Sequence, residues 1–148
     1  MDKKTRNIAA ETSSTTEGEA VKPIRIILGD LILDAQLNDS PTAQKIWEAL
    51  PIETSFSTWG DEIYFSIPVA MELESDAQEL VESGDLGYWP SGNAFCIFFG
   101  PTPISSEGEI RPASAVNMIG RIADDAAQLK ERMSEKLIRL EKREGVTS

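Results

Sequence analysis

Residue types that commonly perform catalysis are scarce in this chain of 148 residues. It contains no histidine, which excludes a Ser-His-Asp or Cys-His nucleophile system, an HExxH zinc site and a histidine general base. Its single cysteine, Cys96, lies in the apolar run 95–99. We interpret it as a buried thiol, because one cysteine can form neither an intramolecular disulfide nor a cysteine-based metal site.

Paired carboxylates and cofactor-binding loops are two other sequence features that can support catalysis. Asp61 and Glu62 are adjacent in an expected strand, so they point to opposite faces and cannot work as an acid and base pair; we interpret both as solvated. The Asp85 side chain is expected to bond nearby backbone amides at a turn. No EF-hand-like loop, GxGxxG phrase or P-loop phrase is present. We therefore predict no catalytic residue, no metal ligand and no cofactor.

Aromatic side chains remain, and the chemistry they favour is binding. All ten lie between Trp47 and Phe99. We assign Phe65, Phe95 and Ile97 to the core, with Trp47 on the apolar face of a helix. The other aromatic candidates lie beside loops or on the polar side of a strand and carry a polar group at one end, which leaves both a ligand surface and ordinary surface packing open. The predicted cleft consists of Trp59, Tyr64, Tyr88, Trp89, Phe99 and Asn117, with Thr102 on a rim loop.

The charge of the chain bears on its partners. The net charge is −11, and residues 1–22 hold four acids and four bases, so the rest of the chain carries the whole excess. Such a surface repels phosphate backbones, and we predict no nucleic-acid partner. No apolar run approaches the roughly 20 residues needed to cross a bilayer, and the first 20 residues lack the apolar segment of a signal peptide. We expect a cytoplasmic protein without a membrane partner.

One domain is expected, because 148 residues with 41% hydrophobic content suit a single core. Residues 1–22 are rich in Ser, Thr and Glu and predict a disordered tail, residues 23–143 form the domain, and residues 144–148 form a second tail. Short strands dominate the domain, which favours a curled or closed sheet with one or two helices.

The first half of the domain has clear periodicities. Residues 24–37 predict two strands joined at Gly29-Asp30, a glycine-first turn. Ser40 can cap a helix that starts at Pro41. Residues 60–68 alternate as a half-buried strand. Asp76 with Glu79 forms a plausible capping box for a short helical turn.

The second half contains more turns. The sequence Trp89-Pro90-Ser91-Gly92 has turn chemistry, 93–99 predicts an apolar strand, and 100–112 predicts a loop. Residues 114–122 predict another strand, and 123–133 predict a helix that Asp124-Asp125 would cap. Residues 136–142 either prolong this helix or form a closing strand, and we favour the strand.

The order of these phrases resembles a known family. "IRIILGDLILDAQLNDSPTAQKIWEAL" is similar to the amino-terminal unit of cyclophilins, and "GNAFCIFFGPTP" resembles their aromatic strand and the loop that follows it. "SPTAQKIWEALP", "WGDEIYF", "GDLGYWPSG" and "CIFFGPTP" resemble more closely a prokaryotic cyclophilin-like family typified by a small Thermotoga protein. The resemblance implies a mainly β fold, a closed eight-stranded antiparallel barrel capped by two helices. It also implies a family without an established biochemical role.

The resemblance does not extend to the cyclophilin catalytic residues. Cyclophilins use a strand arginine near a Phe-His-Arg phrase to donate toward the prolyl amide nitrogen, and that phrase is missing here. None of Arg25, Arg111 and Arg121 can be carried over as this arginine. We therefore predict a protein that binds a peptide segment or a small ligand in the aromatic cleft without catalysis. A weak prolyl cis-trans isomerase and a structural homodimer formed through the aromatic patch are the alternatives.

Overall fold

The computed structural model describes residues 22–143. The two expected tails, residues 1–22 and 144–148, lie outside the described residues except for Lys22. Lys22 begins the first described strand. The elements are β2 (Lys22–Leu28), β3 (Leu31–Leu37), α2 (Pro41–Ala49), β4 (Ile52–Ser55), β5 (Ser57–Thr58), β6 (Glu62–Ser66), β7 (Asp85–Trp89), η1 (Pro90–Gly92), β8 (Ala94–Phe98), β9 (Asn117–Ile122), η2 (Ala126–Arg132) and β10 (Leu137–Lys142).

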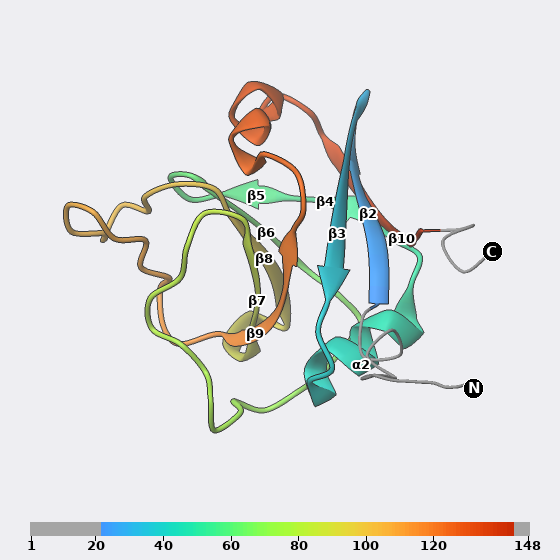
Figure 1. Ribbon diagram of the computed structural model, residues 1–148, viewed down its shortest axis with the longest axis horizontal. Coiled ribbons are helices and arrows are strands. Elements are labelled where there is room, and N and C mark those ends of the chain that lie inside the picture. Colours follow the sequence, from blue (N-terminus) through green and yellow to red (C-terminus); the bar gives the residue numbers. More distant parts are fainter. Residues whose placement is uncertain (1–21, 144–148) are drawn as a thin grey trace, which may run out of the picture.

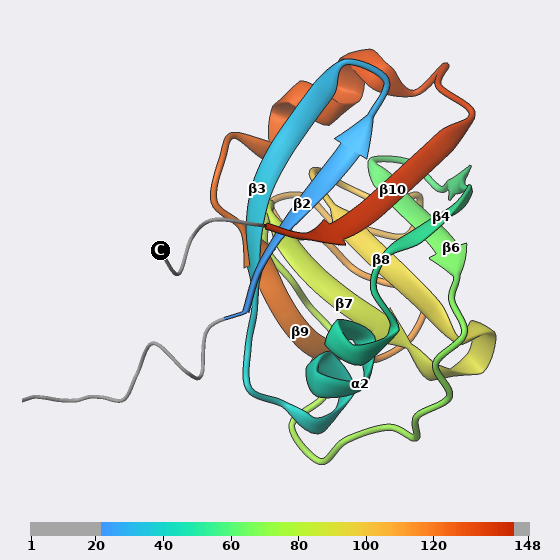
Figure 2. The same cartoon turned by 90° about the vertical axis from the view of Figure 1, so that its right-hand side faces the viewer.

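The described strands form one sheet in the order β4-β10-β2-β3-β9-β7-β8-β6-β5. Every neighbouring pair is antiparallel. The two end strands, β4 and β5, are separated in sequence only by Phe56, so the sheet curls into a nearly closed barrel (Figures 1 and 2). The expected barrel class is confirmed. The described part has nine strands rather than eight, since the chain is interrupted at Phe56 and residues 52–58 form two short strands.

The hairpin of β2 and β3 forms as its alternation predicts. Gly29 turns the chain with a φ of 59°, a value that glycine adopts without strain. The buried side chains on the two strands are Ile24, Ile26, Leu28, Leu33, Ala35 and Leu37, which face the barrel interior. Strand β10 pairs with the other edge of β2, so residues 137–142 form a strand and do not prolong the preceding helix.

Two helices lie at opposite ends of the barrel, as Figure 2 shows. The Ser40 side chain accepts a hydrogen bond from the Ala43 backbone N–H at 3.2 Å, which confirms the predicted start of α2. The second helix, η2, is a 3₁₀ helix, and the Asp125 side chain caps it by accepting from the Ala127 N–H at 3.0 Å. Asp124 does not cap it, because this carboxylate accepts from the Asp34 N–H instead.

Two local expectations were wrong because long-range pairing competed with them. Tyr88 and Trp89 belong to strand β7, which pairs with both β8 and β9, so the turn begins only at Pro90. The capping box of Asp76 and Glu79 forms no helix. The backbone of this segment pairs instead with the loop before β9, through bridges from residue 78 to 116 and from residue 81 to 110.

The hydrophobic side chains form two clusters on opposite faces of the sheet. The larger one fills the barrel and includes Phe65 and Phe95, whose rings stack at 5.3 Å. The smaller one contains Val81, Ala94, Cys96, Phe98 and Val116, and residues from the loop 104–116 pack against it. The outer face of β7 and β8 is therefore covered, and this second cluster positions the site described next.

Candidate functional site

The candidate site lies on the outer face of strands β6 and β8. The interior side chains of β6 are Ile63 and Phe65, so alternation places Glu62 and Tyr64 on the outer face. Cys96 lies directly opposite Tyr64 in the register of the two strands. Loop 104–116 returns alongside this face, because Val116 pairs with residue 78 and packs in the outer cluster. A face that would otherwise be solvated becomes a cavity.

This cavity has a volume of about 180 Å³. Three aromatic side chains line it: Trp59 from the turn after β5, Tyr64 from β6 and Trp89 from the end of β7. The other lining residues are Glu62, Cys96, Pro112, Ala113 and Val116. We call it the aromatic pocket.

The position of Trp89 is fixed by two contacts. Its indole N–H donates to the Ser114 hydroxyl at 2.6 Å, which ties the tryptophan to the covering loop. Gly92 leaves room for the ring, because a Cβ atom there would lie 3.0 Å from an indole carbon. The indole therefore forms a preorganised wall of the pocket.

Glu62 is the charged group of the pocket. The residue is 6% exposed, and no ion pair within residues 22–143 involves its side chain, although a buried carboxylate ordinarily has one. Burial raises the pKa of Glu62 from 4.5 to about 7, and hydrogen bonding with the Cys96 thiol offsets part of this rise. The sequence interpretation of Glu62 as solvated was wrong, since local alternation does not reveal that a loop covers the outer face.

Cys96 is a hydrogen-bonding neighbour and not a nucleophile. It is 2% exposed, and burial together with the nearby Glu62 carboxylate raises the pKa of its thiol well above the ordinary value. Its proton has two acceptors within reach, the Glu62 carboxylate and the Ala94 carbonyl oxygen, the latter at 3.9 Å. The expected buried thiol is confirmed.

Trp59, Tyr64 and Trp89 of the predicted cleft line the aromatic pocket together, whereas its other four residues lie elsewhere. Tyr88 is fully buried, because alternation along β7 places it inside the barrel when Trp89 is outside. Its hydroxyl donates to the Val69 carbonyl oxygen and accepts from the Met71 N–H at 3.2 Å. Phe99 is 3% exposed and belongs to the barrel core.

Thr102 and Asn117 also have structural positions. The Thr102 hydroxyl donates to the Arg111 carbonyl oxygen and closes the base of the covering loop. Asn117 is fully buried; its amide donates to the Glu72 carbonyl oxygen at 2.9 Å and its carbonyl oxygen accepts from the Glu74 N–H at 2.8 Å. These side chains fasten loops to the barrel and have no polar group left for a ligand.

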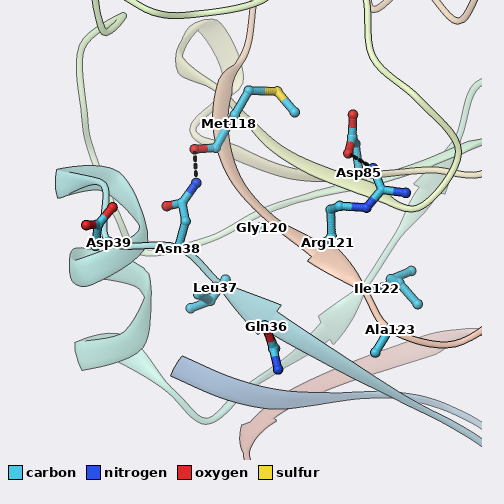
Figure 3. A pocket seen from close by; sticks show the side chains of 10 residues that line it. All are labelled: Gln36, Leu37, Asn38, Asp39, Asp85, Met118, Gly120, Arg121, Ile122 and Ala123. Carbon is cyan, nitrogen blue, oxygen red and sulfur yellow. Dashed lines mark hydrogen bonds and ion pairs between the residues drawn. The ribbon is translucent and has the colours of Figure 1, made fainter. Parts of the chain in front are cut away.

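A second and larger depression, of about 660 Å³, lies along β3 and β9 (Figure 3). Several of its polar side chains are already hydrogen-bonded within the protein. Arg121 donates to the Asp85 carboxylate and to the Ser83 carbonyl oxygen, and the Asn38 amide donates to the Met118 carbonyl oxygen at 2.9 Å. Asp85 also accepts from the Glu82 N–H at 2.8 Å, as the turn prediction expected. Asn38, Asp85 and Arg121 of this depression thus hold strands and turns together.

No arginine lines the aromatic pocket. Among residues 22–143, Arg25 lies 3.7 Å from Asp34 and Arg111 lies 3.0 Å from Glu109, and neither belongs to the pocket lining. Within residues 22–143, no helix is long and apolar enough to cross a membrane. The same residues contain no group of three or more His, Cys, Asp or Glu side chains placed to hold a metal ion.

Comparisons with known proteins agree with this architecture. Residues 22–141 match the family model described as cyclophilin-like. Among solved structures, the chain is similar to a hypothetical protein of Archaeoglobus fulgidus whose solution structure is known. The two share 40% sequence identity with a TM-score of 0.71, over 84% of this chain and 96% of the other. The search among curated proteins found no match.

Proposed function

This chain belongs to the cyclophilin-like family, and we propose that it binds a small ligand, or a single side chain of a peptide, in the aromatic pocket without chemical turnover. The observation that carries the proposal is the convergence of Trp59, Tyr64 and Trp89, which come from three separate segments, on one cavity. Concave sites lined by aromatic groups with few polar ones are characteristic of ligand pockets.

The size of the pocket limits the ligand. A water molecule takes roughly 30 Å³ in the liquid, so a cavity of about 180 Å³ holds the equivalent of about six waters. Pockets that bind drug-sized ligands have volumes of roughly 300–1,000 Å³. The pocket therefore suits a compact group, such as one side chain or a small organic molecule.

The affinity for such a ligand is modest. A compact group that loses on the order of 150 Å² of apolar surface to the walls gains about 4 kcal/mol from burial. Because binding also costs translational and rotational freedom, this free energy corresponds to a Kd no tighter than the order of 1 mM. Binding assays must consequently reach millimolar concentrations, and a tighter complex would need contacts outside the pocket.

The groups in the pocket support binding without turnover. Cys96 keeps its proton because its thiol pKa is raised. Glu62 has no second acid beside it in the pocket, since Asp61, its neighbour in the chain, lies 3.7 Å from Lys130. The lining also offers no arginine to donate toward a prolyl nitrogen.

Tryptophan signals test the proposal directly. Small organic probes, such as N-acetylprolinamide and 3,3-dimethylbutan-1-ol, are titrated into the full chain while the three indole N–H resonances are followed by NMR. We expect the resonances of Trp59 and Trp89 to shift. Trp47, which stands on α2 with the Lys142 ammonium 4.7 Å from its ring, is the internal control and should not shift. Trp47→Phe, Trp59→Phe and Trp89→Phe assign the signals.

A blocking variant supplies the second readout. Ala113 is exposed at the mouth of the pocket, so Ala113→Phe should fill the cavity without disturbing the core and abolish the shifts. Ala127→Phe makes the same change at an exposed position of η2 and should leave them intact. Shifts that persist in Ala113→Phe, or that appear equally at all three tryptophans, would contradict the proposal.

A further inference from the structure

Glu62 has a buried carboxyl group that faces the aromatic pocket without a cationic partner. The residue is only 6% exposed, and the ion pairs of residues 22–143 do not include its carboxylate. Its polar neighbour is the Cys96 thiol, which is neutral. An anionic group held among apolar walls is stabilised by a positive charge brought to it.

The walls around this carboxyl group complement a cation as well. The faces of tryptophan and tyrosine rings attract cations, and the attraction is larger when the site is desolvated. Three such rings surround the cavity, which is otherwise lined by apolar groups apart from Glu62 and Cys96. The chain's net charge of −11 also raises the local concentration of cations at its surface.

The hydrogen-bonding groups of the pocket distinguish among cations. A primary ammonium group has three N–H donors, each of which needs an acceptor when it is buried. The side-chain oxygens of the lining belong to Glu62 and Tyr64 only, and the Trp89 indole is a donor already bonded to Ser114. A methylated ammonium group has few or no N–H donors and presents methyl groups to the rings.

We infer that the aromatic pocket takes a methylated ammonium group, with Glu62 as its counter-charge and Trp59, Tyr64 and Trp89 as its cage. This inference rests on the proposed function and gives the ligand its chemical class. The same group can come from a free small molecule such as choline or from a methylated lysine side chain in a peptide. Its volume is compatible with a cavity of about 180 Å³.

The test compares choline with 3,3-dimethylbutan-1-ol, which has the same shape and no charge. Both are titrated at pH 8.5 and at pH 5.5, and binding is measured from the indole N–H shifts of Trp59 and Trp89. The titratable groups facing Glu62 are Tyr64 on its own strand and Cys96 on β8; the lining residues of β7, the turn after β5 and loop 104–116 carry none. We expect choline to bind about tenfold or more tightly at pH 8.5 than at pH 5.5, as Glu62 ionises between them.

The variant Glu62→Gln keeps the shape of the side chain and removes its charge. It should weaken choline binding about tenfold, to the level of the wild-type chain at pH 5.5, and remove the dependence on pH, while binding of the alcohol should not fall. Glu131→Gln makes the same change of charge at an exposed position of η2 and should behave as wild type. Nα-acetyl-trimethyllysine amide and unmodified Nα-acetyl-lysine amide separate the two sources; binding of the former but not of choline would assign the site to a peptide side chain.

The remaining outcomes overturn the inference. Equal binding of choline and the alcohol by the wild-type chain at pH 8.5 would show an apolar pocket, leaving the proposed function standing while refuting the ammonium class. Stronger binding of unmodified lysine amide than of its trimethylated form would refute methylation as the recognised feature. If no probe moves the Trp59 and Trp89 signals at either pH, the proposed function fails together with the inference.

Discussion

The stability of this protein should fall with rising pH through the titration of Glu62. The pKa of Glu62 is raised from 4.5 to about 7 in the folded chain, so between these values the folded state binds a proton that the unfolded state has lost. Stability is therefore highest below pH 4.5 for this group and decreases as the pH approaches 7. At about 1.4 kcal/mol per pKa unit, the rise from 4.5 to about 7 corresponds to a loss of roughly 3–4 kcal/mol at most, and solvent screening lowers it to about 1–3 kcal/mol.

Glu62→Gln isolates this contribution, because glutamine has nearly the same volume and does not titrate. Urea denaturation at pH 4.5, 6 and 8 gives the free energy of unfolding of wild type and variant. We expect similar stabilities at pH 4.5 and a variant more stable by about 1–3 kcal/mol at pH 8. Glu131→Gln, at an exposed position, corrects for the general change in net charge. A difference between wild type and Glu62→Gln that stays constant over this pH range would refute the argument.

Three further predictions concern the thiol, a loop fastening and a close approach of backbones. The Cys96 thiol should react with a thiol reagent at pH 8 only at the rate of protein opening, because it is 2% exposed and its pKa is raised; complete labelling of native protein within seconds would contradict this. Asn117→Ala should cost about 2–4 kcal/mol in urea denaturation, because buried partners lose their hydrogen bonds; a change below about 0.5 kcal/mol would show that water replaces the amide. Gly120→Ala should unfold or strongly destabilise the chain, since a Cβ atom there would lie within contact distance of the Gln36 carbonyl oxygen, whereas Gly108→Ala, with no atom nearby but a φ of 81°, should cost only about 1 kcal/mol; comparable melting temperatures would refute the packing argument.

Local patterns in the sequence predicted much of the framework. The helix start at Ser40 was predictable because capping and a proline at the first helical position act over a few neighbouring residues. The strand assignment of residues 137–142 was confirmed, and its support came from alternating branched residues together with the family resemblance. Strand β7 was missed as a strand, since Gly87 and the adjacent turn residues weaken its local signal while pairing on both edges stabilises it.

The candidate site was predictable only in part. Trp59, Tyr64 and Trp89 combine an aromatic ring with a position beside a turn or on the outer side of a strand, and this signal located three walls of the pocket. Glu62 lies on the same face of β6 as Tyr64. This shared face was the sequence feature that could have assigned Glu62 to the site. Tyr88 was misassigned because no strand was predicted before the turn residues Trp89-Pro90-Ser91-Gly92, so the alternation that turns its side chain inward was not recognised.

Where alternation is clear, as in β6, the sequence by itself determined which side of the strand each residue occupies. Period-two alternation along β6 separates Ile63 and Phe65 from Glu62 and Tyr64, and this separation is a property of extended backbone geometry. The tertiary structure decided whether the outer side meets water. Pairing of residues 78 and 81 with residues 116 and 110 brings a loop distant in sequence across that face, so an ordinary surface glutamate becomes a buried carboxyl group in an aromatic pocket. Alternation acts between neighbouring residues, whereas burial depends on which distant segment packs on top.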